Sequence, residues 1–250
     1  MREQPEQQAP PVQRLRIRYA KRGRLRFTSH RDFSRAFERA IFRARIPMAY
    51  SSGFNPHPRI SYAGASPTGA ASEAEYLEIG LAEVVDPGAV REALDEALPT
   101  GLDLLDVVVS SGGALADRLE ASVWEITVTG VDPATAQAAV DRLLAIEEVL
   151  VERMTKKGLR TFDARAAILA LDARECATTY AGEDSCAILR VVLRHGTPSV
   201  RPDDVLAALR EISGTPIGSA ALAQRLAQGP WDSEGGTVGD PLQPDRDAAG

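Results

Sequence analysis

Residue types suited to acid–base chemistry gather in the first quarter of the chain. His30 and Asp32 stand two residues apart where a helix is expected to begin, and His57 lies in the turn Gly-Phe-Asn-Pro-His-Pro-Arg, residues 53–59. Metal-free RNA cleavage needs a base, an acid and a cationic stabiliser, and these side chains supply all three types. Residues two apart on a helix do not face each other, so Asp32 is equally a candidate helix cap or arginine partner. The catalytic candidates are therefore His30, Asp32 and His57, and whether the chain is an enzyme stays open.

Positive charge is concentrated around these residues. Residues 14–59 contain 13 arginines and lysines against two acids, whereas the whole chain has a formal net charge of −6. A basic face attracts polyanions whatever the average charge of the protein is. The concentration of positive charge in residues 14–59 therefore indicates an anionic partner. It says less about whether the chain is a catalyst.

The helix expected after Ser29 carries much of this charge. Arg31, Arg35, Arg39 and Arg43 recur every four residues, opposite an apolar face, with Phe42 among them. Apart from Asp32, only Glu38 offers an acid on this helix, so the usual pairs between a glutamate and an arginine four residues away are nearly absent. We interpret Arg35, Arg39 and Arg43 as phosphate-binding residues and Phe42 as a base-stacking residue. A solvated helix face is the alternative.

The turn at 53–59 presents four further candidates. Prolines on both sides of His57 stiffen the segment, which lowers the entropy lost when it engages a ligand. We interpret Phe54 as a stacking residue and Asn55, His57 and Arg59 as residues that read or clamp RNA; the alternative is a purely structural loop. A second basic segment contains Lys156, Lys157 and Arg160, and it either extends the RNA-binding surface or forms an ordinary exposed loop.

The pattern of apolar residues predicts the elements that position these side chains. From Arg14, apolar residues alternate with Arg14, Arg16 and Arg18, which predicts a half-buried strand with a basic outer face. The order over residues 14–110 is β-α-β-β-α-β, the ferredoxin-like plan. The second half repeats it more loosely, with 155–172 interpreted as a loop leading into a short element and a final edge strand near Ile217.

The fold class expected is therefore α+β, with two ferredoxin-like (βαββαβ) modules in tandem. The first module spans 13–112 and the second, looser one spans 120–228. The tails at 1–12 and 229–250 are expected to be disordered, because the first is rich in Gln, Pro and Glu and the second in Gly, Asp and Pro.

Composition excludes several classes of protein. Cys176 and Cys186 are the two cysteines, and neither has a Cys or His at ligand spacing, so we expect no disulfide framework, metal site or cofactor. We interpret both as inert thiols. No apolar run approaches the roughly 18 residues of a membrane helix, and the N-terminal residues lack the apolar core of a secretory signal. These features predict a reduced, cytoplasmic protein that is not inserted in a membrane.

A long composite motif resembles the bacterial family of radical-SAM-linked, or radical-SAM-associated, proteins, a domain of unknown function. The resemblance covers about residues 13–228. It rests on the following matches: Ser29, His30 and Asp32; the run 35–40; the segment 49–58; Ser72, Glu75 and Tyr76; and the basic motif 156–165. Such proteins lie beside, or are fused to, radical-SAM enzymes. Because this sequence has no Cys-x3-Cys-x2-Cys motif, the resemblance implies that the radical-SAM partner is a separate polypeptide.

These observations combine into one main hypothesis. The chain is expected to be an accessory protein that binds structured RNA, tRNA or rRNA, and works with a separate modifying enzyme. One alternative is a protein-interaction module that docks a radical-SAM partner without RNA. A second alternative is a metal-free ribonuclease or RNA-modifying enzyme.

Overall fold

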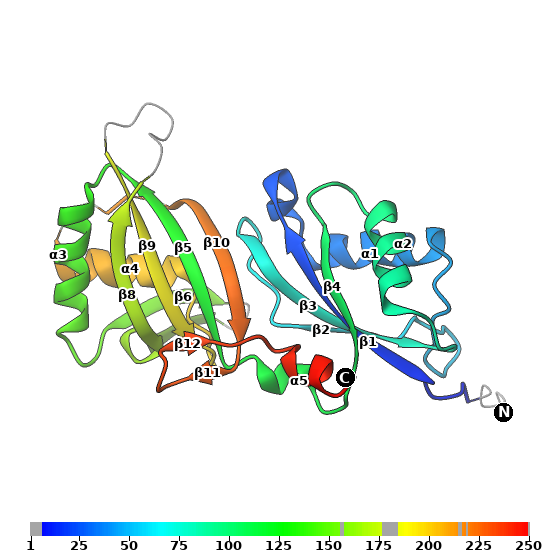
Figure 1. Cartoon of the computed structure of the whole chain (residues 1–250). Helices are drawn as coiled ribbons and strands as arrows, with labels where there is room; N and C mark the ends of the chain where they lie inside the picture. Colours follow the sequence, from blue (N-terminus) through cyan, green and yellow to red (C-terminus); the bar gives the residue numbers. More distant parts are fainter. Residues whose placement is uncertain (1–6, 156–157, 177–184, 215–216, 219, 250) are drawn as a thin grey trace. The chain divides into compact units, whose positions relative to one another are not determined.

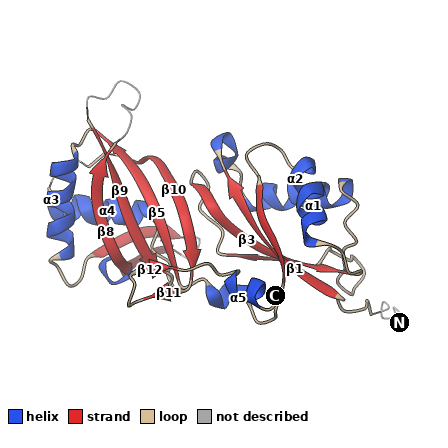
Figure 2. Cartoon of the chain, in the orientation of Figure 1, coloured by secondary structure: helices blue, strands red, loops and turns tan. Residues whose placement is uncertain are grey.

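The chain folds into two compact units in a computed structural model that describes residues 7–155, 158–176, 185–214, 217–218 and 220–249. The first unit comprises Met1–Leu119 together with Asp240–Gly250, and the second comprises Glu120–Gly239. Both units mix helices with antiparallel strands, so the chain is an α+β protein (Figures 1 and 2). The division at Leu119 falls within the stretch between the two predicted modules.

The first unit has the β-α-β-β-α-β order that its sequence predicts. Its strands neighbour one another in the order β4-β1-β3-β2, and each adjacent pair is antiparallel. The elements are β1 (Gln13–Lys21), α1 (His30–Arg43), β2 (Ile60–Ala63), β3 (Ala71–Leu81), α2 (Pro87–Ala97) and β4 (Leu104–Val109). Short 3-10 helices occur at Gly23–Phe27 and Leu115–Arg118.

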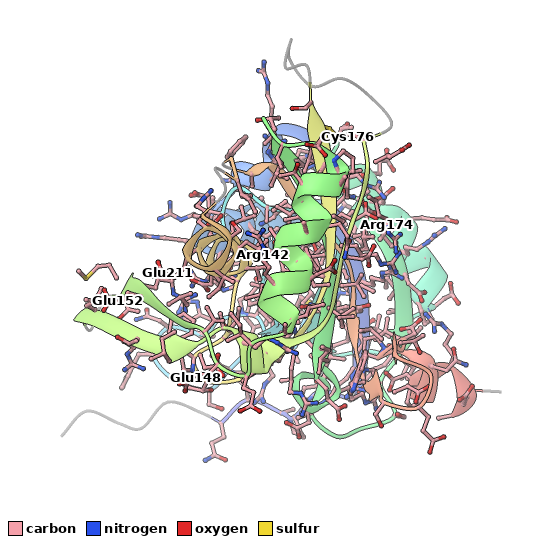
Figure 3. All side chains as sticks on the ribbon, turned by 90° about the vertical axis from the view of Figure 1, so that its left-hand side faces the viewer. Arg142, Glu148, Glu152, Arg174, Cys176 and Glu211 are labelled. Carbon is pink, nitrogen blue, oxygen red and sulfur yellow. A yellow bond between two sulfur atoms is a disulfide. The ribbon has the colours of Figure 1, made fainter. Side chains whose placement is uncertain are left out.

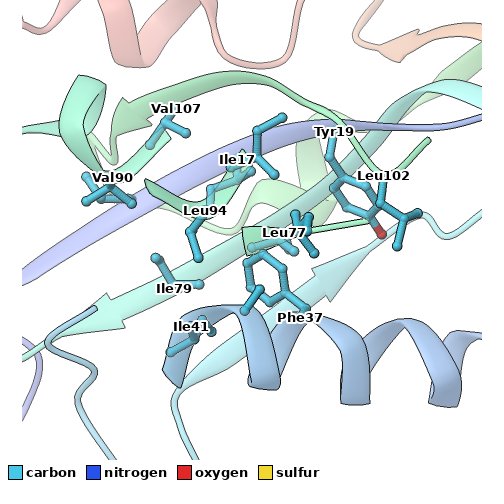
Figure 4. Close-up of a cluster of buried hydrophobic side chains, with 14 of the residues drawn as sticks. Ile17, Tyr19, Phe37, Ile41, Leu77, Ile79, Val90, Leu94, Leu102 and Val107 are labelled. Atoms are coloured by element: carbon cyan, nitrogen blue, oxygen red, sulfur yellow. The ribbon is translucent and has the colours of Figure 1, made fainter. Parts of the chain in front are cut away.

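Alternation along the strands places the core of this unit between its sheet and helices α1 and α2. Ile17 of β1 and Leu77 of β3 are completely buried and pack with Phe37 of α1 and Leu94 of α2 (Figure 4). Neighbouring residues on a strand point to opposite faces, so the even-numbered arginines of β1 face away from the helices. The sequence pattern therefore fixes which side of the sheet each β1 residue occupies.

Helix α1 starts where the sequence predicts and ends earlier. Ser29 is its N-cap, and the Ser29 hydroxyl oxygen accepts a hydrogen bond from the backbone N–H of Asp32 at 3.2 Å. A proline at position 47 would end a helix that reached it, but α1 already ends at Arg43, and Arg45 adopts a φ of 54°. Termination in a left-handed residue after the last turn makes the proline unnecessary for stopping the helix.

The predicted basic outer face of β1 is wrong at its centre. The side chain of Arg16 is fully buried under the C-terminal helix α5 (Gln243–Asp247), where it donates to both carboxylate oxygens of Asp245. Leu242 is also fully buried and packs with Tyr76 of β3. The C-terminal segment is therefore an ordered part of the first unit, which corrects the expectation of a disordered tail at 229–250. Buried ionic contacts with β1 and apolar contacts with β3 hold this segment in place, and its composition gave no indication of them.

The second unit has the strand order β10-β5-β9-β8, again antiparallel at each adjacent pair. Its elements are β5 (Ala121–Thr129), α3 (Pro133–Leu144), β6 (Leu150–Thr155), β7 (Gly158–Asp163), β8 (Ile168–Glu175), β9 (Cys186–Arg194), α4 (Pro202–Ser213), β10 (Ala220–Gly229), β11 (Trp231–Asp232) and β12 (Thr237–Val238), with a 3-10 turn at Arg165–Ala167. Strands β11 and β12 pair with each other within the stretch expected to be disordered.

Two parts of the second unit differ from the sequence-based prediction. The segment 155–172, expected to be mostly loop, contains β7 and part of β8, and β7 pairs with β6 as a separate hairpin. The final strand begins at Ala220, after Ile217, and its pairing with β5 runs through most of its length. Alternation of apolar and polar residues is weak in both segments, because most residues of β7 are exposed and most residues of β10 are half-buried.

Helices α3 and α4 pack against each other, and side chains join them at their ends. The guanidinium of Arg142 on α3 donates to the carbonyl oxygen of Ser213, the last residue of α4, at 3.1 Å; Figure 3 places Arg142 between the two helices. Cys176, after β8, and Cys186, at the start of β9, form a disulfide. This pairing corrects the expectation that both thiols are free and inert.

Candidate nucleic-acid interface

The exposed side of α1 forms a basic surface. A shallow hollow of about 650 Å³ is lined by Arg35, Glu38, Arg39, Phe42 and Arg43, which we call the α1 face. The ring of Phe42 is 86% exposed at this surface, whereas Phe33 and Phe37 on the opposite side of the helix are buried. One helix thus uses its aromatic residues both to anchor itself in the core and to present a ring to solvent.

Residues 14–59, which we call the basic window, contain arginines that are paired with carboxylates and arginines that are not. Arg14, Arg16 and Arg22 are paired with carboxylates, namely Glu78, Asp245, Glu73 and Asp103. Arg35 and Arg39 form no ion pair with any residue that the structure describes. Hence carboxylates neutralise part of the charge seen in the sequence, at Arg14, Arg16 and Arg22, whereas the charge of Arg35 and Arg39 on α1 is not neutralised in this way.

Arg43 differs from the other two phosphate-binding candidates. One of its terminal nitrogens donates to the carbonyl oxygen of Ala97, the last residue of α2, at 3.2 Å. A cation is favourable at this end of a helix because the backbone dipole places partial negative charge there. Arg43 therefore joins α1 to α2 as well as lining the α1 face.

The 53–59 turn is held by hydrogen bonds on both sides and is exposed at its tip. The backbone N–H of Arg59 donates to the carbonyl of Ala49, and the side-chain Nε of Arg59 donates to the carbonyl of Tyr50 at 3.0 Å. The backbone N–H of His57 donates to the hydroxyl oxygen of Ser51 at 3.0 Å. Phe54 is 70% exposed, and the side chains of Asn55 and His57 are also exposed. The loop can present these groups without first ordering itself.

Ser51 is a residue whose importance the sequence analysis missed. Its hydroxyl accepts the backbone N–H of His57 and so fixes the base of the turn. Serine side chains often bond to nearby backbone groups in turns, so the pair Ser51-Ser52 before Gly-Phe-Asn-Pro was the available signal.

The three catalytic candidates have separate environments. Asp32 accepts a hydrogen bond from the hydroxyl of Ser29 at 2.7 Å and so belongs to the cap of α1. The ring of His30 meets Tyr62 of β2 edge-on at 4.7 Å between centroids, and burial raises the pKa of the Tyr62 hydroxyl. Across the described residues, no hydrogen bond or ring contact joins His57 to His30 or Asp32. The folded chain does not bring these side chains together as a catalytic group.

The second basic segment contributes one describable candidate. Arg160 is exposed on β7, opposite Arg153 in the hairpin register, while Lys156 and Lys157 lie outside the described residues. Arg153 pairs with Asp204 at the start of α4. Burial raises the pKa of the Asp204 carboxyl, despite the opposing effects of the Arg201 backbone N–H and the Arg153 guanidinium. Of the two facing arginines, Arg153 and Arg160, it is therefore Arg160 that is accessible to a ligand.

Two features are absent from the described part of the chain. It contains no group of three or more His, Cys, Asp or Glu residues arranged to hold a metal ion. Within the same residues, no helix has both the length and the apolar character needed to cross a membrane.

The fold and its basic surface define an α+β protein with a cationic helix face. Residues 14–202 match the family model described as "Uncharacterized protein conserved in bacteria (DUF2344)", so the chain belongs to that bacterial family. A search of curated proteins finds no match to this chain.

Proposed function

We propose that this protein binds structured RNA, tRNA or rRNA, through the α1 face and serves as an accessory protein to a separate radical-SAM enzyme. The radical-SAM link comes from the resemblance of the 29–76 and 156–165 motifs to radical-SAM-associated proteins. Its location would then be the cytoplasm, where such RNAs are found.

One observation carries the RNA-binding proposal. Arg35 and Arg39 stand beside the 86% exposed ring of Phe42, with no ion-pair partner among the described residues. Guanidinium groups bind phosphate oxygens through paired hydrogen bonds, and an exposed ring stacks on unpaired bases. A folded RNA offers phosphates and unpaired bases side by side, whereas duplex DNA offers its bases only through the grooves.

The strand orders support a finer description of the fold. In the first unit the order β4-β1-β3-β2 with two crossing helices fits a ferredoxin-like module. The second unit has the same arrangement in β10-β5-β9-β8, provided that the β6–β7 hairpin is treated as an insertion between α3 and β8. We propose two ferredoxin-like modules on this basis.

The geometry favours binding over cleavage. A general base and its orienting partner should lie within hydrogen-bonding distance of each other, and His30, Asp32 and His57 have the separate environments described above. Asp32 is already engaged at the helix cap. The proposal therefore assigns RNA contact, and no bond-breaking step, to this chain.

The test is equilibrium binding of the full chain to fluorescently labelled total tRNA at fixed salt, with duplex DNA as a competitor. Arg35→Ala/Arg39→Ala should weaken tRNA binding by about tenfold or more, because two charge-assisted contacts are lost. The double variant Arg174→Ala/Arg194→Ala, which removes the same charge from exposed positions of the second unit, is the control and should bind as the native chain does.

A variant that removes a negative charge from the α1 face should have the opposite effect on tRNA binding. Glu38 is the acid of the α1 face, so Glu38→Gln should strengthen tRNA binding by about two- to fivefold. Equal weakening in both arginine double variants would show that only net charge matters. Absence of tRNA binding at moderate salt would contradict the proposal and leave docking to an acidic protein partner as the use of this surface.

A further inference from the structure

The first unit contains a second polar site, on the side of its sheet away from α1 and α2. Leu15 and Ile17 of β1 lie in the core beneath the helices, so Arg14, next to Leu15, points to the other face. There a pocket of about 310 Å³ is lined by Arg14, Ser51, His57, Arg59, Ser61 and Glu78, among others. This volume is at the lower end of the range for small-molecule sites.

The only carboxylate among these lining residues is already neutralised. Oε1 of Glu78 accepts from Arg14 at 2.9 Å, while Oε2 accepts from Nε of Arg16 at 3.0 Å and from the hydroxyl of Ser110 at 3.2 Å. Nε of Arg59 donates a hydrogen bond to the carbonyl oxygen of Tyr50. The two terminal nitrogens of the Arg59 guanidinium have no hydrogen-bond acceptor within the described chain. The pocket therefore carries an excess of positive charge and unused N–H donors.

Hydroxyl and imidazole groups complete the lining. The oxygen of Ser51 accepts the backbone N–H of His57, which leaves the Ser51 hydroxyl hydrogen available to donate. Ser61 on β2 and the imidazole of His57 are exposed at the pocket. These donors come from β1, β2 and the 53–59 turn, so they can surround a ligand with several acceptor oxygens.

One end of the pocket is closed by the segment before β1. A Cβ atom added at Gly80 would lie 2.7 Å from Cγ of Pro11 and 3.3 Å from Cβ of Arg59. Pro11 therefore packs directly on β3, and it does so because residue 80 has no side chain. Pro11 and Gly80 both line the pocket, so their close packing forms part of its wall.

We propose that this pocket binds a phosphate monoester, such as a nucleoside 5′-monophosphate. A monoester has three terminal oxygens and carries nearly two negative charges at neutral pH, which suits two guanidinium groups with added hydroxyl donors. A carboxylate ligand would leave donors unused, and a backbone phosphodiester carries a single charge. The inference rests on the lining of the pocket and does not depend on RNA binding by the α1 face.

Calorimetric titration of the full chain tests this assignment. The ligands are inorganic phosphate and adenosine 5′-monophosphate, with adenosine, acetate and dimethyl phosphate as controls for the base, the charge and the diester. Arg14→Gln removes a lining charge at a side chain that is 56% exposed, so folding should be preserved. Ser61→Trp fills the pocket from an exposed position without changing its charge. Arg24→Gln removes the same charge from an exposed site that does not line the pocket.

Saturable binding of both phosphates supports the proposal if Arg14→Gln weakens it by about tenfold, Ser61→Trp abolishes it and Arg24→Gln leaves it unchanged. Binding of inorganic phosphate alone would mean that the pocket accepts the phosphoryl group and rejects a nucleoside, which overturns the nucleotide assignment. Equal binding of dimethyl phosphate, or no binding of either phosphate at millimolar concentration, would overturn the monoester assignment. The tRNA titration of the α1-face variants is unaffected by any of these outcomes, so the two proposals fail separately.

Discussion

Arg16 and Asp245 form a buried ion pair across 229 positions of sequence, with both side chains fully excluded from solvent and 2.8 Å between Nη1 and Oδ1. Asp245 also accepts from the backbone N–H and hydroxyl of Ser111 and from Arg118. Arg16 completes its bonds with Glu78 and with the carbonyls of Gly112 and Gly113. The C-terminal segment is thereby fixed to the sheet of the first unit.

Asp245→Asn should destabilise the protein by about 3 kcal/mol, because it removes one of the two carboxylates that pair with the buried Arg16 guanidinium and also the carboxylate that pairs with Arg118. Denaturant unfolding followed by circular dichroism measures the change in the free energy of unfolding. Asp247→Asn, the same change two residues later at an exposed position, is the control and should alter stability by less than about 0.5 kcal/mol. Equal stability of the two variants would mean that the C-terminal helix does not hold Arg16 in solution.

Acid should weaken the same contact. Burial favours the protonated carboxyl of Asp245, but hydrogen bonds from Ser111, Arg16 and Arg118 outweigh it and hold the pKa below its ordinary value. With the folded pKa below the unfolded value of about 4, this stabilisation is complete above pH 4 and is lost as the pH falls through the folded pKa. Unfolding experiments between pH 6 and pH 3 should show a steeper loss of stability for the native chain than for Asp245→Asn. Parallel curves would assign the acid sensitivity to other groups.

Two of the exposed phenylalanines in residues 14–59, Phe42 and Phe54, should behave differently. Phe42 lies among the arginines of the α1 face, and Phe54 lies at the tip of the 53–59 turn. Phe42→Ala should weaken tRNA binding by about 1–3 kcal/mol if its ring stacks on a base, with little change in stability. Phe54→Ala is the matched variant, and the α1-face account predicts a smaller loss. Measured affinities that rank the other way would move the stacking contact to the turn.

The disulfide between Cys176 and Cys186 gives a separate test in the second unit. Closing a loop of about ten residues restricts the unfolded chain, which stabilises a folded domain by roughly 3 kcal/mol. Thermal melting of the native chain should therefore shift to lower temperature on addition of a thiol reductant. Cys186→Ser should melt at the lower temperature with or without reductant. Identical melting of the native chain in both conditions would contradict the pairing.

Local pattern was sufficient to predict the β-α-β-β-α-β elements within residues 14–110, but it did not predict α5, which also belongs to the first unit. The alternation of Leu15 and Ile17 with arginines and the helical spacing of Phe33 and Phe37 predict β1 and α1, because both elements bury one face on a single core. The strand β7 was missed because most of its residues are exposed and give no regular alternation of apolar and polar side chains.

The partners of charged residues could not be read from the sequence. Arg14, Arg16 and Arg18 alternate identically with apolar residues, yet Arg16 is fully buried and Arg14 is largely exposed. The difference arises because Asp245 reaches β1 from the far end of the chain, and local sequence carries no signal for a contact at that separation. The same reason explains why the basic window looked more uniformly cationic than the folded surface is.

The most direct test of the RNA-binding account is the dependence of tRNA affinity on salt. Each phosphate neutralised by an arginine contributes about 0.7–0.9 to the slope of log affinity against log salt concentration. The native chain should show a steep slope, and Arg35→Ala/Arg39→Ala should lower it by about 1.4–1.8, while Arg174→Ala/Arg194→Ala should leave it unchanged. An identical slope in the native chain and the α1-face variant would show that Arg35 and Arg39 contact no phosphate, which would contradict the account.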